Sequence, residues 1–155
     1  MKKQLVSIAI VTYNRCDYLR IALEAALSQT YPDFELLIVD NASNDNTAQM
    51  VCQYNDPRLL YIRRSINAGP GANYGEALTR AKGDFILVSH DDDVMHPELV
   101  ARQLEAFSRY PDAVLVATNV GLITSTGDII QDALYDNQSD RFFQKGEFLR
   151  VSLDE

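Results

Sequence analysis

Three consecutive carboxylates, Asp91, Asp92 and Asp93, are the residues of this sequence with the clearest potential for chemistry. Neighbouring carboxylates repel one another unless water or a cation lies among them. Mg²⁺ and Mn²⁺ bind oxygen ligands of this kind and often take substrate phosphates as further ligands. Taken alone, the run is equally typical of a solvated loop ahead of the helix expected at Pro97. Its place just after the strand expected over residues 85–88 favours the metal site.

Two histidines, His90 and His96, bracket the acidic run. An imidazole nitrogen is a common metal ligand, but a ligand role is the less favoured interpretation for either residue. His96 is more simply explained as a cap of the following helix.

Three further polar segments offer groups that could bind a nucleotide. Residues 12–15 supply a hydroxyl, a ring for stacking, an amide and a guanidinium for phosphate, although a turn into a helix would use the same residues. Asp40 could accept hydrogen bonds from a base or a ribose, or could form an Asx turn in its Asn-rich loop. The glycines of residues 67–73 would let the backbone approach a ligand, but they lack the spacing of a dinucleotide-binding fingerprint.

Apolar runs of strand length alternate with helical patterns along the chain. The strands are expected over residues 6–11, 34–39, 59–62, 85–88 and 113–117. A turn at residues 125–128 predicts a terminal hairpin between residues 121–124 and 129–131. The alternation predicts right-handed βαβ units, and therefore an α/β fold with a mostly parallel, mixed sheet and helices on both faces.

The helices between these strands have apolar faces that would pack on the sheet. One of them would turn Tyr74, Ala77 and Leu78 inward and would end at Gly83, since glycine commonly follows the last helical residue. Ligands of such folds bind beyond the carboxyl ends of the strands. All four polar segments are therefore expected at one edge of the sheet.

Length and composition narrow the class of protein. The 155 residues suit one domain with a sizeable core, and 14 basic against 22 acidic residues give a net charge of −8. That charge argues against a nucleic-acid or anionic membrane partner. Cys16 and Cys52 stand alone, which is typical of reduced thiols in a cytoplasmic protein. No apolar run approaches the ~20 residues of a transmembrane segment, and no secretory signal is recognisable.

Taken together, the polar segments resemble the motifs of the family 2 glycosyltransferases. The resemblance covers nearly the whole of residues 1–155, in four ordered motifs: Thr12-Tyr13-Asn14-Arg15, residues 39–45, Asn67-Ala68-Gly69 with Asn73, and the acidic run ahead of Pro97. It implies the nucleotide-binding half of a three-layer GT-A fold. It also implies a nucleotide-diphosphate sugar donor, commonly a UDP-sugar, a divalent cation (Mn²⁺ or Mg²⁺), and inverting transfer to the hydroxyl of a saccharide, lipid-linked or protein acceptor.

The same resemblance assigns roles to particular residues. It implies that Thr12 and Tyr13 border the base and that Asp40 hydrogen-bonds it. The remaining nucleotide-sugar contacts implied are Asn14, Arg15, Asn67, Gly69, Asn73, Asp91 and Asp92. Asp92, as the last acid of a DxD motif, and Asp93 would hold the metal.

The sequence departs from the family pattern in three places. His90 stands where an acid is usual, and Ala72 precedes Asn73 where an arginine is common. No Glu-Asp motif follows Asp93, since Glu147, Asp154 and Glu155 lack its context, so no catalytic base is identifiable. The missing base and the weak secondary-structure pattern after Leu134 predict that residues 1–155 are the N-terminal portion of a longer catalytic domain.

Two further interpretations remain beside a transferase. The missing base makes a nucleotide-sugar-binding module without transfer activity of its own the main alternative. A phospho-acceptor signalling domain is less favoured, because it would need an acid pair where residues 12–14 lie and a lysine where Thr118 and Asn119 follow the fifth expected strand.

Overall fold

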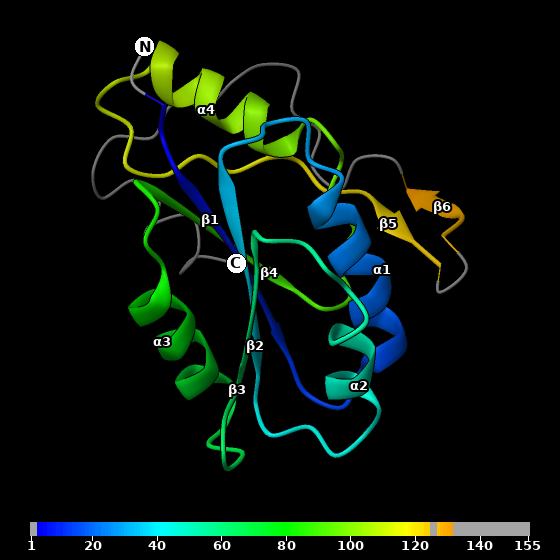
Figure 1. Cartoon of the computed structure of the whole chain (residues 1–155). Coiled ribbons are helices and arrows are strands. Elements are labelled where there is room, and N and C mark those ends of the chain that lie inside the picture. The colour runs from blue at the N-terminus through cyan, green and yellow to red at the C-terminus, as the bar shows by residue number, and fades with distance from the viewer. Residues whose placement is uncertain (1–2, 125–126, 132–155) are drawn as a thin grey trace, which may run out of the picture. The chain divides into compact units, whose positions relative to one another are not determined.

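The computed structural model describes residues 3–124 and 127–131, and the chain divides into two compact units, Met1–Ala113 and Val114–Glu155. In the first unit strands and helices alternate, as expected (Figure 1). Its elements are β1 (Val6–Thr12), α1 (Cys16–Leu27), β2 (Phe34–Asp40), α2 (Thr47–Val51), β3 (Leu59–Arg63), α3 (Pro70–Arg80), β4 (Phe85–His90) and α4 (Leu99–Arg109).

The strands of the first unit form one parallel sheet in the order β3-β2-β1-β4. Its register aligns Thr12 with Asp40 and Asp40 with Arg63, and it pairs Val11 with His90. The last residues of all four strands consequently lie at one edge of the sheet, which confirms the arrangement that the sequence predicted for the polar segments.

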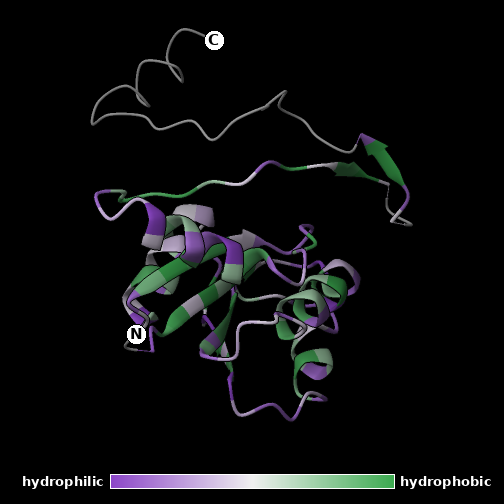
Figure 2. Ribbon diagram, turned by 90° about the horizontal axis from the view of Figure 1, so that it is seen from above, coloured by the Kyte–Doolittle hydropathy of each residue, from purple (hydrophilic) through white to green (hydrophobic). Residues whose placement is uncertain are grey.

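Helices cover both faces of this sheet, as predicted. On one face, Ile8, Ile10 and Leu36 belong to a core cluster to which α1, α2 and α4 contribute. On the other face, Ala9 and Val11 cluster with Ala77 of α3. The central strand β1 is buried along its whole length because it is covered from both sides. In Figure 2 the strands are accordingly mostly green, whereas the helices show both hydrophobic and hydrophilic residues.

The second unit contains the expected hairpin. Strands β5 (Leu122–Ile123) and β6 (Ile129–Gln131) pair in antiparallel fashion, and Gly127 adopts a positive φ of 89° in the turn. The hairpin forms a two-stranded sheet of its own rather than joining the larger one, so the four-stranded sheet is entirely parallel. The turn residues 125–126 lie outside the described residues.

Three local expectations were wrong. Residues 113–117 are not a strand, because no described strand hydrogen-bonds to them, and Val114 is 97% exposed. Leu78 is 59% exposed rather than packed inward, since Ala77 and Tyr74 fill the face of α3 that meets the sheet. Gly83 is not the residue after α3, which has Ala81 at its C-cap.

Within the described residues, no helix has both the length and the apolar character that crossing a membrane requires.

Candidate functional site

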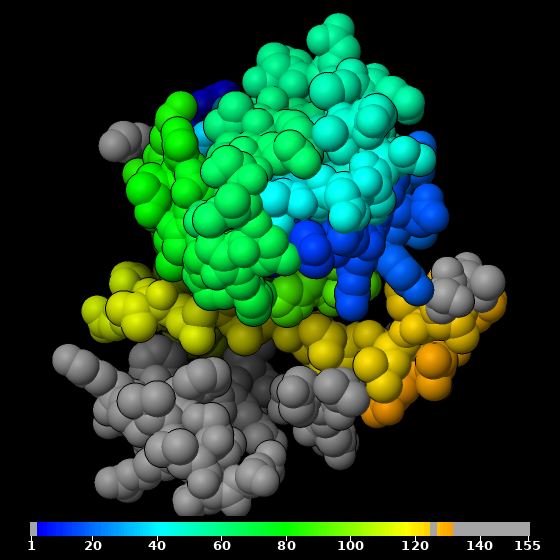
Figure 3. Space-filling view, turned by 90° about the horizontal axis from the view of Figure 1, so that it is seen from below, coloured from blue at the N-terminus to red at the C-terminus, as the bar shows by residue number. Residues whose placement is uncertain are grey.

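The loops that follow the four parallel strands surround a cavity of about 360 Å³. Figure 3 looks from below at this end of the first unit, where the blue, cyan and green segments after β1, β2 and β3 meet. Six predicted site residues line the cavity: Thr12, Tyr13, Arg15, Asn67, Asn73 and Asp91. The other predicted residues belong to the same loops but lie outside the lining.

Four polar, aromatic or turn residues of the lining were not among the predicted nucleotide contacts: Asn41, Pro70, Tyr74 and His90. Asn41 and Pro70 lie inside the segments already singled out, so their position in the motif could have identified them. Tyr74 was assigned to the core from its helical spacing. It is only partly buried, and its hydroxyl bonds the ring of His90.

The acidic run divides between two environments. Asp91 is 5% exposed and turns inward, where its Oδ2 accepts a hydrogen bond of 2.7 Å from the Thr12 hydroxyl. Its Oδ1 lies 3.4 Å from Nη1 of Arg15. Burial raises the pKa of the Asp91 carboxyl group, although the Thr12 bond and the Arg15 charge oppose that shift. Asp91 therefore joins the loop after β1 to the loop after β4.

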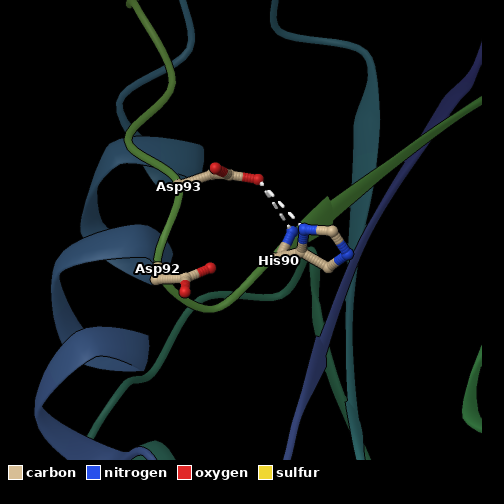
Figure 4. A group of neighbouring side chains, drawn as sticks. All are labelled: His90, Asp92 and Asp93. Atoms are coloured by element: carbon tan, nitrogen blue, oxygen red, sulfur yellow. Dashed lines mark hydrogen bonds and ion pairs between the residues drawn. The ribbon is translucent and has the colours of Figure 1, made fainter. Parts of the chain in front are cut away.

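Asp92 and Asp93 turn outward and lie beside His90 (Figure 4). One ligand atom from each of the three residues lies within 4.8 Å of the others, and all three side chains are exposed. Arg15 also reaches this group, because its Nη1 contacts Oδ2 of Asp92, and that hydrogen bond is the largest cause of the raised pKa of Arg15. One imidazole nitrogen with two carboxylates is a donor set that suits a divalent transition-metal ion.

Asp40 is fully buried at the end of β2. Its Oδ1 accepts hydrogen bonds from the backbone N–H (2.8 Å) and the hydroxyl of Ser43, and its Oδ2 accepts one from the Tyr61 hydroxyl. Arg63 lies near, with Nε 3.6 Å from Oδ2. Burial, together with the bond to Asp40, raises the pKa of Tyr61 strongly. Asp40 thus stabilises its own loop and the end of β3.

The first two loops are fastened to each other by polar side chains. Asn14, in a left-handed conformation with φ of 54°, donates its N–H to Ser43 Oγ and accepts the N–H of Asn44 at Oδ1. Asp45 accepts the N–H of Cys16 at 3.0 Å and so satisfies a free donor at the start of α1. The Asn14 side chain therefore positions the loop that carries Tyr13 and Arg15.

The third loop is held by amide side chains. Asn67 Oδ1 accepts hydrogen bonds from Asn41 Nδ2 (2.8 Å) and from the N–H of Gly69 (2.9 Å). Gly69 has φ of 83°, a conformation that favours glycine directly before Pro70 begins α3. Asn73 is buried and donates Nδ2 to the carbonyl of Val39 at 2.8 Å. Its Oδ1 is buried without a partner among the described residues.

Comparison with known proteins gives this arrangement its context. Residues 7–151 match the family described as Glycosyl transferase family 2. An uncharacterized glycosyltransferase of Methanocaldococcus jannaschii is 31% identical over 136 residues, which cover 85% of this chain and 47% of that protein. The succinoglycan biosynthesis protein ExoO of Rhizobium meliloti is 28% identical over 146 residues, which cover 94% and 39%. The chain spans less than half the length of these two relatives.

Solved structures agree with the sequence relatives. TarS 1–349 of S. aureus, in complex with UDP-GlcNAc, has a TM-score of 0.65 at 26% identity, over 74% of this chain and 37% of that one. The mannosyltransferase PcManGT of Pyrobaculum calidifontis, in complex with GDP-Man and Mn²⁺, has a TM-score of 0.64 at 21% identity, over 78% and 35%, and shares the fold. The predictions of family and fold class are confirmed: the chain belongs to glycosyl transferase family 2 and has the GT-A fold.

Proposed function

We propose that this chain is the donor-binding portion of an inverting glycosyltransferase, which transfers a sugar from a nucleotide-diphosphate sugar to an acceptor hydroxyl. The observation that carries the proposal is the cavity of about 360 Å³ at the carboxyl edge of the sheet, lined by residues from all four motif-bearing loops. Ligands of open parallel sheets bind at this edge. The likeness to TarS, solved with UDP-GlcNAc, supports a UDP-sugar as the donor.

Different residues of the cavity would bind different parts of the nucleotide-sugar donor. Tyr13 is 43% exposed and offers a ring on which a base can stack. Thr12, Asn67 and Asn73 line the cavity and offer polar groups to the nucleoside. Arg15 would bind the diphosphate, since a guanidinium bonds phosphate oxygens in a fixed fork.

Asp40 needs a rearrangement before it can contact a base. Its carboxylate is fully buried, and the Tyr61 hydroxyl occupies Oδ2. A carboxylate has about four lone-pair positions, two on each oxygen, so Oδ2 becomes available to a base N–H once the Tyr61 hydroxyl and Arg63 move away. The proposed base contact of Asp40 therefore includes a movement at the end of β3.

Asp92 and Asp93 would hold the divalent cation. They fit it because both carboxylates are exposed and lie in one cluster with His90. When bound, the cation offsets the negative charge that develops on the leaving nucleotide diphosphate. Arg15, beside Asp92, would add a second positive charge at the same phosphates.

Transfer with inversion also requires a base that deprotonates the acceptor hydroxyl. Among the described residues that line the cavity, Asp91 is the only carboxylate, and it already accepts hydrogen bonds from Thr12 and Arg15. This observation favours, as the second candidate for the chain by itself, a nucleotide-sugar-binding module without transfer activity.

Calorimetric titration with UDP, UDP-GlcNAc and GDP, each with and without Mn²⁺, tests the proposal. We expect the uridine nucleotides to bind in a metal-dependent manner. The absence of metal-dependent nucleotide binding at millimolar ligand would overturn the proposed function. Measuring UDP release from the bound sugar donor in the presence of simple saccharide acceptors separates the two candidates, because a binding module alone releases none.

A further inference from the structure

We propose that His90 is a nitrogen ligand of the divalent cation and that it makes the site prefer Mn²⁺ over Mg²⁺; the inference rests on the proposed function. His90 occupies the position at the end of β4 where the family resemblance leads one to expect an acid. Its ring lies beside Asp92 and Asp93, with the three ligand atoms within 4.8 Å of one another (Figure 4). The site therefore offers nitrogen as well as oxygen.

The second nitrogen of His90 is already held by a neighbour. The Tyr74 hydroxyl forms a hydrogen bond with Nε2 of His90, and the two rings meet edge to face with centroids 5.9 Å apart. Histidines that bind metals usually donate their other ring N–H to a carboxylate, a carbonyl or a water, and the hydroxyl oxygen of Tyr74 can accept the N–H of Nε2 in the same way. In that tautomer the lone pair of the ring is on Nδ1, where it can bind a cation.

That lone pair faces a carboxylate. Nδ1 of His90 lies 3.5 Å from Oδ2 of Asp93, and the same Oδ2 accepts the backbone N–H of His90 at 3.2 Å. A neutral imidazole nitrogen and a carboxylate oxygen are both acceptors, so they repel each other unless a cation lies between them. In the tautomer with the proton on Nε2, Nδ1 of His90 and Oδ2 of Asp93 are therefore two neighbouring acceptors that a cation can bind together.

The mixture of donors determines which cation is preferred. Mg²⁺ favours oxygen ligands and retains its water reluctantly, whereas imidazole suits first-row transition metals. Replacing His90 by aspartate restores an all-oxygen set of similar size. We expect His90→Asp to lower the ratio of Mn²⁺ to Mg²⁺ affinity by about tenfold.

Electron spin echo spectroscopy of Mn²⁺ bound to the whole chain with UDP tests the nitrogen ligand directly. Coupling to imidazole ¹⁴N should be present in the wild type and absent in His90→Asp, while Mn²⁺ remains bound. His96→Gln is the matched control, since His96 is the other of the two histidines and its Nδ1 accepts the N–H of Glu98 at 3.2 Å. The control should retain the coupling.

The outcomes separate this inference from the proposed function. If Mn²⁺ and UDP bind together but no imidazole coupling appears, or if the coupling survives in His90→Asp, the ligand role of His90 is overturned and the proposed function stands. If the Mn²⁺ to Mg²⁺ ratio is unchanged in His90→Asp, the selectivity is overturned. If UDP binding is independent of metal, both proposals fail.

Discussion

Nη1 of Arg15 lies 2.5 Å from Oδ2 of Asp92, and this ion pair joins the loop after β1 to the loop after β4. Both side chains are about half exposed. In the proposed function, Arg15 binds the diphosphate and Asp92 binds the metal ion. Without a ligand, the Arg15 guanidinium is therefore paired with the carboxylate that is expected to bind the metal ion. The guanidinium and the metal ion then compete for Asp92.

Arg15→Gln removes that competitor. We expect the affinity of the nucleotide-free chain for Mn²⁺ to rise by about two- to fivefold, because an exposed ion pair contributes up to about 1 kcal/mol. The affinity for UDP in the presence of Mn²⁺ should fall about tenfold or more, since a charge-assisted hydrogen bond to phosphate is lost. Paramagnetic resonance measures the first effect and calorimetry the second. Arg102→Gln on α4 should change neither; an unchanged Mn²⁺ affinity in Arg15→Gln contradicts the competition.

Asp92→Ala should abolish the metal-dependent part of nucleotide binding. The substitution removes one of the two carboxylates of the cluster with His90 and one of the two ion pairs of Arg15, which keeps its contact with Asp91. Calorimetric titration of UDP with and without Mn²⁺ should then give the same affinity. Asp112→Ala, which removes an equal charge from the exposed turn after α4, is the control and should retain the metal effect. Metal dependence that persists in Asp92→Ala would assign the metal to other residues.

Tyr61→Phe should weaken the fold through Asp40. The buried carboxylate loses a donor, and a hydrogen bond to a charged group contributes about 1.5–3 kcal/mol to the free energy of unfolding. Urea denaturation measures the loss. Tyr31→Phe is the matched control, because the Tyr31 hydroxyl donates to the uncharged carbonyl of Gln4, where about 0.5–1.5 kcal/mol is expected. Equal losses in the two variants would show that the charge of Asp40 adds nothing.

Gly83→Ala should destabilise the chain because backbone crowds this position. A Cβ at residue 83 would lie 2.5 Å from the nitrogen of Ser7, 2.6 Å from the oxygen of Phe85 and 2.8 Å from the oxygen of Leu5. We expect a loss of about 1–3 kcal/mol in the free energy of unfolding, as for other overpacked sites. Gly75→Ala in α3, where a Cβ meets no atom within 4 Å, should instead gain about 0.5–1 kcal/mol. An unchanged free energy of unfolding in Gly83→Ala would contradict the close approach of the backbone to residue 83.

The pair of Asp56 and Arg58 at the start of β3 should contribute to acid unfolding. The hydrogen bond from Arg58 lowers the pKa of the Asp56 carboxyl group below its usual range. A carboxyl group whose pKa is lowered by folding stabilises the folded chain at a pH above its pKa in the unfolded chain, which is about 3.9. This stabilisation is lost as the pH falls through the pKa of the group in the folded chain. Urea denaturation from about pH 5 to about pH 2.5 should therefore show a shallower decline for Asp56→Asn than for the wild type. A parallel decline in the two proteins would exclude this contribution.

The order of the elements, and the edge of the sheet at which the site lies, could be predicted from the amino-acid sequence. Parallel βαβ units bring the carboxyl ends of successive strands together, so Thr12, Asp40 and His90 could be placed at one edge from their positions alone. The family could be recognised from the same four segments. Residues 113–117 show the limit of such patterns, because an apolar run becomes a strand only where another strand offers hydrogen bonds.

The contacts of the individual polar side chains could not be predicted in this way, because they depend on how the elements pack. Asp91 and Thr12 are 79 residues apart, yet their hydrogen bond turns one acid of the run inward and leaves Asp92 and Asp93 beside His90. Two other hydrogen bonds likewise join different elements: the Tyr61 hydroxyl bonds Asp40, and the Tyr74 hydroxyl bonds His90. Periodicity reports the face on which a residue lies, but the partners of a buried or clustered polar group come from distant parts of the chain, and only packing brings them together.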